Sequence, residues 1–397
     1  MTTIACIFGS RSVEHEVSVI TAQQAMAALG PHHRAVPAYI AKDGRWYTGD
    51  ALTDLGRFGD VQGLLADCTV VTPVIDPSRP GLSLLPVSAP RRGRFGRGSD
   101  DAVALEVDVA MPLVHGNLGE DGTLQGLLEM AGVPYTGSGV AASATAMDKR
   151  LAKTVLRAAG LPVLDDVCID REQWRVDPGS VLERAESFAP YPLYVKPVTL
   201  GSSIGVARAT DRTEMQVAIE VALTYDQRCI VEAAQEDIVE INCAVLGDDS
   251  GARASLLEQP TKRGLLSYND KYRSKGGKPA SAPSGMKSAQ RLIPAPLDAE
   301  LAARITQAAL DSFAAVGAAG VARVDLMVDP ATGSLIVNEI NPIPGSLSFY
   351  LFEPAGISFT ALLDELIEIA QRRHARRAAS TAVFEHWMLG GGPKSSA

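Results

Sequence analysis

The chain has 397 residues, with 37 Lys and Arg against 46 Asp and Glu, and its formal net charge is −9. At about 150 residues per domain this length predicts two or three domains, and the lack of a strongly basic half or tail argues against a protein that coats nucleic acid. The composition, 46% hydrophobic and 21% charged, is that of a folded globular chain and excludes extensive disorder.

Membrane and export signals are not recognisable in the sequence. A membrane-spanning helix needs about 20 mostly apolar residues, and every such window here contains charges, Gly or Pro. The N-terminal MTTIACIFGS lacks the basic region of a signal peptide and is typical of a buried strand. The five cysteines are scattered without a CxxC pair, which argues against disulfides or a zinc site and predicts free thiols in a reducing cytoplasm.

The first third of the chain alternates strand and helix patterns. Apolar runs at IACIF, AVPAYI and VDVAMPLV predict strands, and helical patterns cover residues 16–29 and 124–130. This alternation predicts an α/β layer with a mostly parallel sheet. Residues 49–101 combine Pro, Gly and Arg, which favours a peripheral hairpin or loop insertion. A nucleic-acid patch is the alternative, disfavoured because the basic run is short and has no aromatic ladder.

The remaining chain divides into two further segments. A helix over ATAMDKRLAKTVLRAAG is expected to end at Gly160, and strands follow at YPLYVKP and SSIGVARA, then a helix and the strand RCIVEAA. The third segment has a strand at EINCAVLG, a polar stretch over residues 267–287, a helix over 301–316 and two more strands. The tail after Ala375 is expected to be flexible.

The pattern VARVDLMVDPATGSLIVNEIN predicts a β-hairpin with acids on one face. A loop of five residues, 330–334, would set Asp325 opposite Glu339 and Arg323 opposite Asn341. Two carboxylates about 5 Å apart repel unless a cation or proton lies between them. Oxygen ligands without His or Cys suit magnesium. The alternative is a hairpin with a solvated polar face.

Two lysine-containing motifs are candidates for phosphate binding. In YVKPVTLGSSIGVARA a Gly/Ser loop follows Lys196, so that backbone N–H groups and an ammonium can meet anionic oxygens, although an ordinary hairpin turn explains the loop equally well. Lys149 lies on or beside a helix, where most lysines are merely solvated. The polar SYNDKYRSKGGKPASAPSG is typical of an active-site lid contacting through Lys271 and Tyr272, or else of a disordered surface loop.

Two turns near the N-terminal strands are the remaining candidates. FGSRSVEHEVS predicts a strand, a turn and a helix start around Ser12 and Glu14, without the GxGxxG of a dinucleotide site. His115 follows an apolar strand in a Gly-rich turn, where binding sites of open α/β sheets gather. A structural histidine is the alternative.

Taken in chain order, these motifs resemble the D-alanine–D-alanine ligase family of ATP-grasp enzymes. The match runs through FGSRSVEHEVS, HGNLGEDGTLQGLLEMAGVPYTGSG, AMDK, VKPVTLGSSIGV, YNDKY, ARVDLMV and NEINPIPG, and the later GISFTALLDELIEIA is also similar. The resemblance implies a mixed α/β fold with a three-domain ATP-grasp architecture. Its expected parts are a parallel α/β domain over 1–138 with the insertion near 49–101, a central subdomain over 139–235, a C-terminal subdomain over 236–375 with a lid over 267–288, and a flexible tail over 376–397.

The resemblance also implies roles for individual residues. Those for ATP are Lys149, Lys196, Ser203 and Lys271 toward the phosphates, Glu232 toward the adenine or its linker, and Glu240 toward the ribose. Those for magnesium, a pair of ions that manganese can replace, are Asp325, Glu339 and Asn341. Those for catalysis are Glu14, Ser202, Tyr272, Arg323 and the backbone N–H of Gly345, and those for the amino acids are Glu14, His115, Tyr350 and Leu351.

The implied activity is ligation of two D-alanines through an acyl phosphate, for peptidoglycan precursors. The resemblance further implies a cytoplasmic homodimer acting on small molecules, with no nucleic-acid or membrane partner. Tyr350-Leu351 stands where typical members carry the Ser-Leu pair that holds the second substrate's carboxylate, Pro342 replaces Thr, and Ser10 replaces Gly. A related dipeptide ligase of secondary metabolism with another second amino acid is therefore the alternative. A non-catalytic nucleotide-binding protein is disfavoured by the complete Glu14, Arg323 and acid set.

Overall fold

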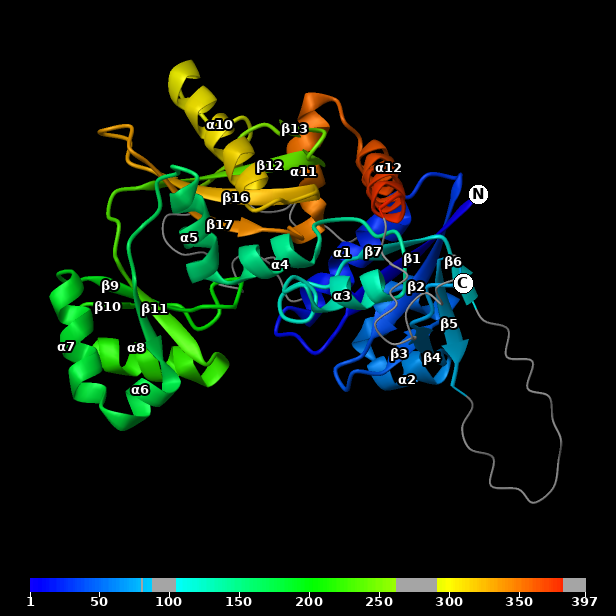
Figure 1. Ribbon diagram of the computed structural model, residues 1–397, viewed down its shortest axis with the longest axis horizontal. Coiled ribbons are helices and arrows are strands. Elements are labelled where there is room, and N and C mark those ends of the chain that lie inside the picture. Colours follow the sequence, from blue (N-terminus) through cyan, green and yellow to red (C-terminus); the bar gives the residue numbers. More distant parts are fainter. Residues whose placement is uncertain (80, 88–104, 262–290, 381–397) are drawn as a thin grey trace, which may run out of the picture.

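The computed structural model describes residues 1–79, 81–87, 105–261 and 291–380 (Figure 1). Within these ranges the strands form a seven-stranded sheet, two four-stranded sheets and a two-stranded ribbon. The seven-stranded sheet has the order β6-β5-β4-β3-β2-β1-β7, with β1 Thr2–Gly9, β2 His33–Ile40, β3 Trp46–Thr48, β4 Thr69–Val74, β5 Leu82–Pro86, β6 Leu105–Val107 and β7 Val109–Pro112.

The N-terminal sheet is parallel only at one end. β1 pairs in parallel with β2 and β7, whereas β2, β3, β4, β5 and β6 pair antiparallel in succession. The mostly parallel sheet was therefore a wrong expectation for the edge, because the link between β2 and β3 is a tight turn and a parallel neighbour needs a crossover of a dozen or more residues. The segment expected as a peripheral insertion does contain a hairpin, β4–β5, but that hairpin extends the sheet and follows the short helix α2 Val61–Ala66.

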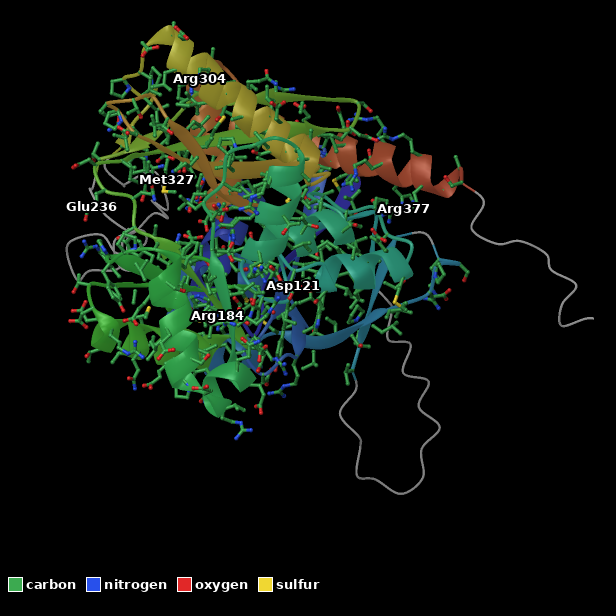
Figure 2. The ribbon with its side chains drawn as sticks, turned by 60° about the vertical axis from the view of Figure 1, so that its left-hand side comes forward. Asp121, Arg184, Glu236, Arg304, Met327 and Arg377 are labelled. Atoms are coloured by element: carbon green, nitrogen blue, oxygen red, sulfur yellow. The ribbon has the colours of Figure 1, made fainter. Side chains whose placement is uncertain are left out.

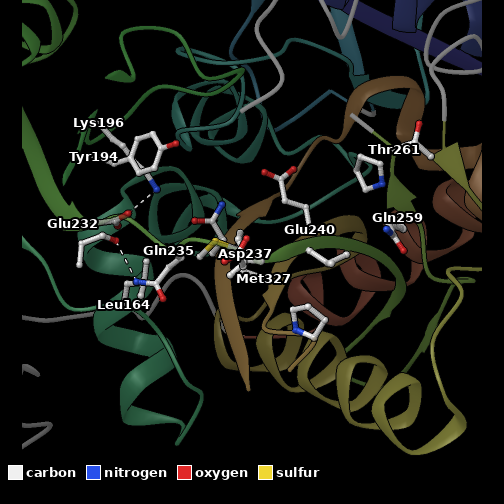
Figure 3. A pocket seen from close by; sticks show the side chains of 16 residues that line it. Leu164, Tyr194, Lys196, Glu232, Gln235, Asp237, Glu240, Gln259, Thr261 and Met327 are labelled. Atoms are coloured by element: carbon white, nitrogen blue, oxygen red, sulfur yellow. Dashed lines mark hydrogen bonds and ion pairs between the residues drawn. The ribbon is translucent and has the colours of Figure 1, made fainter. Parts of the chain in front are cut away.

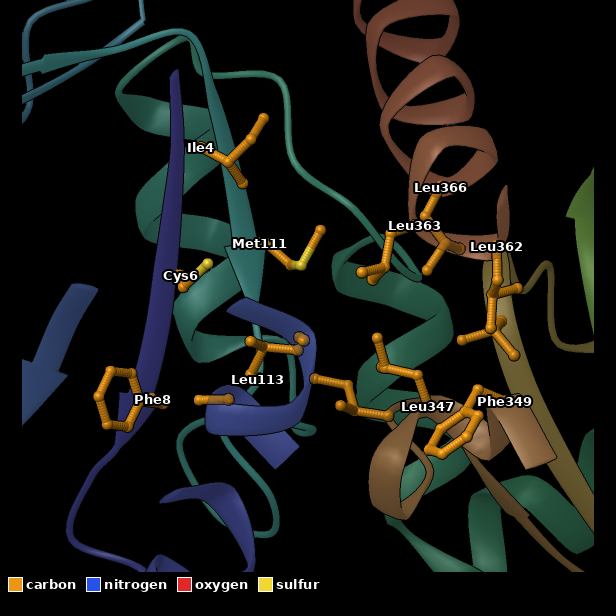
Figure 4. Close-up of a cluster of buried hydrophobic side chains, with 14 of the residues drawn as sticks. Ile4, Cys6, Phe8, Met111, Leu113, Leu347, Phe349, Leu362, Leu363 and Leu366 are labelled. Carbon is orange, nitrogen blue, oxygen red and sulfur yellow. The ribbon is translucent and has the colours of Figure 1, made fainter. Parts of the chain in front are cut away.

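Side chains of β1 alternate between two cores. Ala5 and Ile7 pack with α3 Thr123–Met130, whereas Ile4, Cys6 and Phe8 pack with α1 His15–Ala28 and with α11 Phe349–Phe352 and α12 Phe359–Ala378. Figure 4 shows this second cluster, in which residues from opposite ends of the sequence face one another. The C-terminal helix thus completes the N-terminal core, and His33 of β2 also bonds Asp364 of α12 at 3.1 Å.

The rest of the chain forms two antiparallel sheets. One has the order β10-β9-β11-β8 and the other β13-β12-β16-β17. The first contains β8 Val167–Asp170, β9 Leu193–Pro197, β10 Ala207–Ala209 and β11 Arg228–Ala233, with helices α6 Arg171–Val176, α7 Pro178–Phe188 and α8 Arg212–Tyr225. The second contains β12 Val239–Asp248, β13 Gly251–Ala254, β16 Gly320–Val328 and β17 Leu335–Asn341, with α10 Ala299–Ala315 and the ribbon β14 Gln259–Pro260 and β15 Arg291–Leu292.

Helices cover the outward face of each of these two sheets. α7 and α8 bury their apolar side chains on the first sheet and α10 on the second. Figure 2 shows Arg184 of α7 and Arg304 of α10 on separate sides of this half of the molecule. The opposite faces of the sheets are therefore left to form a site between them.

Local geometry corrects three expectations. The helix expected over ATAMDKRLAKTVLRAAG is two helices, α4 Val140–Met147 and α5 Lys149–Ala158, because the Asp148 side chain accepts the Arg150 and Leu151 N–H groups at 3.0 and 2.9 Å and so starts a new helix. The strand SSIGVARA is confined to Ala207–Ala209. α12 continues to Ala378, so the first residues of the expected tail are helical, and residues 381–397 lie outside the described part.

Among the described helices, none alone combines the length and apolar composition of a membrane-spanning helix, and only the sharply bent pair Gly345–Ala355 and Phe359–Ala378 would meet that test jointly.

Candidate active site

The hairpin β16–β17 brings the predicted acids together. Asp325 lies opposite Glu339 and Arg323 opposite Asn341, which confirms the predicted pairing. Beyond Asp325 the register shifts, because Leu326 opposes Val337 and Asn338 is the extra residue of a β-bulge. The turn is accordingly one residue longer than expected, and the bulge restores the predicted register at the site.

Asp325 is held by groups from both strands. Arg323 donates from Nε and Nη2 to the two Asp325 oxygens at 2.5 and 2.6 Å, and Asn341 Nδ2 donates to Oδ2 at 3.1 Å. Burial lowers the pKa of Arg323, but the Asp325 charge outweighs it and raises this pKa above its ordinary value. The set of Asp325, Glu339 and Asn341 supplies only oxygen ligands suited to a hard divalent cation.

Basic side chains face these acids from the neighbouring sheet. Lys196 on β9 lies 2.6 Å from Glu232 on β11, and Lys153 on α5 also pairs with Glu232. Burial raises the pKa of Glu232, but the two lysines overcome this and lower it to about 2. Burial likewise opposes protonation of Lys196, and Glu232 and Glu339 together raise its pKa. Lys153 also lies 3.6 Å from Asp166, so the two lysines and the two acids of this cluster balance in charge.

Lys149 and Lys153 lie on one face of α5. Lys149 Nζ donates to the Leu200 carbonyl of the Gly/Ser loop, and its backbone N–H donates to Val198 at 3.1 Å. Burial lowers the pKa of Lys149, and the nearby Glu339 opposes this shift. Lys153 was missed by sequence analysis, although its spacing of four residues from Lys149 places both on the same helix face.

A cavity of about 520 Å³ lies between the two antiparallel sheets (Figure 3). Its lining includes three of the predicted nucleotide residues, Lys196, Glu232 and Glu240, together with Tyr194 and Met327. Cavities of about 300–1,000 Å³ with apolar walls and a few polar groups are typical of small-molecule sites. This one has aromatic and apolar surface beside the Lys196–Glu232 ion pair.

Glu14 lies where three segments converge. The Ser202 hydroxyl donates to Glu14 Oε1, and Glu14 is 5% exposed. A Cβ added at Gly116 would lie 2.7 Å from Glu14 Oε2, and one at Gly201 would lie 3.0 Å from the same oxygen, so both loops approach this carboxylate closely because they carry glycine. Ser202 and Ser203 both adopt left-handed backbone angles, a strain that clusters at functional sites.

His115 and Glu120 are buried behind Glu14. His115 Nε2 lies 2.8 Å from Thr21 Oγ1, and burial lowers the pKa of His115 to about 4 despite a backbone hydrogen bond to Ile343. Burial and the charge of Glu14 raise the pKa of Glu120 to about 8. These contacts favour the structural alternative for His115. Sequence analysis missed Glu120, whose only signal was a place five residues after His115 in the same motif.

Replacing His115 with Asn is expected to flatten the acid limb of the stability curve. The imidazole is neutral when folded, with a pKa of about 4 against 6.5 unfolded, so its contribution is present above pH 6.5 and lost as the pH falls toward 4. The loss is on the order of 3 kcal/mol in total. Urea unfolding of both proteins at several pH values measures it, and parallel curves would contradict it.

The segment after Gly345 leads to a second buried polar group. Tyr350 Oη donates to Glu258 Oε2 at 3.2 Å, Asn242 Nδ2 donates to the same oxygen at 3.2 Å, and Arg291 pairs with Glu258 Oε1 at 3.0 Å. The Arg291 guanidinium also lies 4.2 Å from the centre of the Tyr350 ring. Leu351 is fully buried beside Tyr350. Glu258 and Arg291 were not identified from the sequence, because neither lies in a recognisable motif.

Lys271 and Tyr272, together with the expected lid, lie outside the described residues. Of the other predicted residues, Lys196, Glu232 and Glu240 line the cavity, Asp325, Glu339 and Asn341 lie together on the β16–β17 hairpin, and Ser202 contacts Glu14.

Comparisons with known proteins agree over most of the chain. The family patterns described as "D-ala D-ala ligase N-terminus" and "D-ala D-ala ligase C-terminus" match residues 3–138 and 155–368. A D-alanine–D-alanine ligase of Chloroherpeton thalassium is 37% identical over 94% of this chain and 97% of its own length. One of Kineococcus radiotolerans is 38% identical over 93% and 96%.

Solved structures are similar as well. The D-alanine-D-alanine ligase of Coxiella burnetii superposes with a TM-score of 0.75 at 29% identity, covering 95% of this chain and 97% of that one. The VanG D-Ala:D-Ser ligase of Enterococcus faecalis gives a TM-score of 0.73 at 29% identity, covering 93% and 99%.

Proposed function

The chain belongs to the D-alanine–D-alanine ligase family, and from this membership and the site geometry we propose how it joins two D-alanine molecules with ATP. It is an ATP-dependent ligase with an ATP-grasp fold, and its product is D-alanyl-D-alanine for peptidoglycan synthesis. The observation that carries the proposed mechanism is the opposition of Asp325 and Glu339 on strands that also contribute Met327 and Asn338 to the lining of the cavity.

ATP occupies the cavity between the two antiparallel sheets in this proposal. The apolar and aromatic part of the lining suits the adenine, Glu240 the ribose, and Lys149 and Lys196 the phosphates. Glu232 keeps Lys196 charged, since it raises the pKa of this lysine. Lys271 would add a further phosphate contact.

Asp325, Glu339 and Asn341 hold magnesium in this proposal. Two observations support this fit. The three residues supply only oxygen ligands, and the phosphate-binding candidates Lys149 and Lys196 lie close enough to Glu339 for its charge to favour the protonated form of both. When bound, magnesium would offset phosphate charge during transfer. The Asp325 oxygens would then contact both the magnesium ion and Arg323, whose hydrogen bonds already orient them.

Two steps make the peptide bond. The first D-alanine's carboxylate attacks the γ-phosphorus, and ADP leaves, giving an acyl phosphate. The second D-alanine's deprotonated amine then attacks the acyl carbon and a C–N bond forms. The C–O bond to phosphate breaks, the nitrogen loses one proton to the departing phosphate, and hydrogen phosphate leaves. Arg323 and the Gly345 N–H stabilise the tetrahedral oxyanion between these events.

Glu14 binds the ammonium of the first D-alanine in this proposal. Its carboxylate is buried and already oriented by the Ser202 hydroxyl, so an incoming cation meets a preorganised anion. Tyr272 would complete this network from the lid and exclude water from the acyl phosphate.

We place the second amino acid against Tyr350, which is 4% exposed, because Leu351 is fully buried in the core and offers no surface to a ligand. The Tyr350 hydroxyl is directed to Glu258 rather than replacing a serine hydroxyl directly, so we assign the acceptor carboxylate to Arg323 with the Tyr350 ring as a wall. This difference is the observation that favours the second candidate function, ligation of D-alanine to another amino acid.

Replacing Tyr350 with Phe is expected to raise the KM for the second amino acid about fivefold while leaving kcat and the ATP KM near wild type, because loss of a hydrogen bond worth about 1 kcal/mol loosens the wall. Initial rates across D-alanine concentrations, fitted for two binding steps, measure it. Tyr225→Phe, at a half-exposed tyrosine, is the control. An equal change in the ATP KM would count against this assignment.

A panel of amino acids tests the function itself. Phosphate release and dipeptide formation are measured with ATP, magnesium and each of D-alanine, D-serine, D-lactate and L-alanine, alone and in pairs with D-alanine. D-alanine alone is expected to give D-alanyl-D-alanine. No product with D-alanine alone, but product with D-alanine and another amino acid, would establish the second candidate instead.

We further propose that the ligase acts as a cytoplasmic homodimer and that its working units are residues 1–138, 139–235 and 236–375. Light scattering of the purified chain tests the dimer, and cell fractionation tests the location. Limited proteolysis near residues 138 and 235 tests the boundaries.

A further inference from the structure

The backbone around Gly345 is strained and fully buried. Ser346, Leu347 and Ser348, which follow it directly, have φ angles of 54°, 50° and 51° and are at most 4% exposed. Non-glycine residues in this left-handed region cost about 1–3 kcal/mol each and persist only where the surroundings hold them. Three in succession require a firm external hold on the segment.

Polar side chains from the N-terminal part of the chain, which contains the seven-stranded sheet, hold the 343–348 segment by hydrogen bonds on both sides of Gly345. The Ile343 N–H donates to Glu120 Oε1 at 3.1 Å, and the Ser346 N–H donates to Thr21 Oγ1 at 3.1 Å. Each bond joins residues more than 200 positions apart in sequence. The Gly345 N–H therefore lies between two backbone N–H groups whose directions are fixed.

The two holding groups are themselves fixed. Glu120 Oε2 accepts the Gly116 N–H at 2.6 Å, and Thr21 Oγ1 lies 2.8 Å from His115 Nε2. The neutral His115 has one ring N–H, which it donates to the Ile343 carbonyl, so its Nε2 accepts the Thr21 hydroxyl proton while the Thr21 oxygen accepts the Ser346 N–H. His115 thus connects the two grips.

We infer that Thr21, His115 and Glu120 form an interdomain clasp that aims the Gly345 N–H at the developing oxyanion, so that they are positioning residues for peptide-bond formation rather than for ATP use. This inference rests on the proposed function, in which Gly345 acts only in the second chemical step.

Apolar packing already accounts for cohesion at this junction. Leu347 and Phe349 lie against the core of β1, β7 and α12 in Figure 4, in the cluster that contains Leu113 and Leu362. That packing is non-directional, whereas a hydrogen-bond donor must be directed closely at the oxyanion to act. The clasp is therefore expected to affect the rate of one step more than stability.

The Thr21→Val and Thr21→Ser pair tests this inference. Valine keeps the shape and removes the hydroxyl, whereas serine keeps the hydroxyl. The assay uses ATP labelled with ¹⁸O in the β,γ-bridge. When acyl-phosphate formation reverses, the label moves from the bridge to a non-bridging position. The ratio of label scrambling to dipeptide formation therefore reports how often the acyl phosphate returns to ATP rather than reacting with the second amino acid.

Thr21→Val is expected to raise this ratio and lower kcat by about 10- to 100-fold, less than complete loss of an oxyanion donor. Thr21→Ser is expected to remain within about threefold of wild type, since it retains the hydrogen bonds.

Two further variants separate positioning from folding. Glu120→Gln retains one acceptor oxygen for either the Ile343 or the Gly116 N–H, but it turns an NH₂ group toward the other of these two donors. It is expected to raise the ratio of label scrambling to dipeptide formation. Gln23→Leu is the matched control, because Gln23 on the same helix bonds the Leu52 carbonyl at 2.7 Å and not the Gly345 segment. It is expected to leave the ratio unchanged even if it lowers the unfolding midpoint.

The possible outcomes are distinct. A raised ratio in Thr21→Val and Glu120→Gln with an unchanged ratio in Gln23→Leu supports the clasp. Scrambling and dipeptide formation reduced equally, or an unchanged ratio in a folded Thr21→Val, overturns it. A wild-type chain that makes no dipeptide from D-alanine would instead overturn the proposed function.

Discussion

Replacing Glu339 with Gln is expected to lower ATP-dependent dipeptide formation about a thousandfold, since a metal ligand contributes several kcal/mol to stabilising the transferring phosphoryl group. The amide is the same size as the carboxylate but is a weaker ligand for a hard cation. ADP release is measured over a magnesium titration, where the residual activity should require much higher magnesium.

The same substitution is expected to leave the apo protein folded. Glu339 lies opposite Asp325 and helps to raise the pKa of Glu120, so its removal relieves repulsion among these acids, and this offsets the lost attraction of Glu339 to Lys149 and Lys196. The unfolding midpoint without metal should therefore stay close to that of wild type. Glu300→Gln on the exposed side of α10 is the control. Activity within tenfold of wild type, at ordinary magnesium concentrations, would refute the ligand role.

Replacing Arg323 with Lys is expected to reduce kcat for dipeptide formation about 100- to 1,000-fold, the range found for loss of an oxyanion-stabilising donor. Lysine keeps the charge, so Asp325 retains a cationic neighbour. It cannot reproduce the fork that Arg323 presents to the two Asp325 oxygens at 2.5 and 2.6 Å. Donor geometry rather than charge is thereby tested.

The measurement for Arg323→Lys is kcat and KM for ATP and for both D-alanine sites. The ATP KM should stay within a few-fold of wild type, whereas the acceptor KM should rise and kcat should fall. Arg304→Lys, at an arginine that bonds the Gly333 carbonyl on the far side of the sheet, is the control. Wild-type kcat in Arg323→Lys would remove this residue from the chemistry.

The proposed acceptor side contains Tyr350-Leu351, where the sequence departs from the Ser-Leu pair of typical family members. The Tyr350 ring lies between Arg291 and the buried core, and its hydroxyl is engaged by Glu258. Under the proposed assignment, discrimination between D-alanine and a larger or more polar second amino acid depends on how far the Tyr350 ring can move. This chain is similar to the solved structures of a D-alanine-D-alanine ligase and of a D-Ala:D-Ser ligase, each at 29% identity. The amino-acid panel is therefore the measurement that distinguishes the two candidate functions.

Short-range patterns were sufficient for a large part of the molecule. The alternating runs located β1, β2, β7, β9, β11 and β12, and the helical periodicity located α1, α3 and α10 close to their observed ends. The opposition of Asp325 and Glu339 was also predictable, because strands joined by a tight turn must pair antiparallel and the side-chain period of a strand is two. All of these features depend on neighbours within about twenty residues of chain, which the sequence displays directly.

The remaining features arise from contacts between segments far apart in the chain. Lys153 and Glu232 are separated by 79 positions, and Ser346 and Thr21 by 325, and no local pattern says that either pair will meet. The direction of the sheet edge, the completion of the N-terminal core by α12 and the grip on Gly345 have the same origin. Burial, pKa shifts and hydrogen-bond direction depend on which groups surround a side chain, and for these residues the surroundings exist only after the chain has folded.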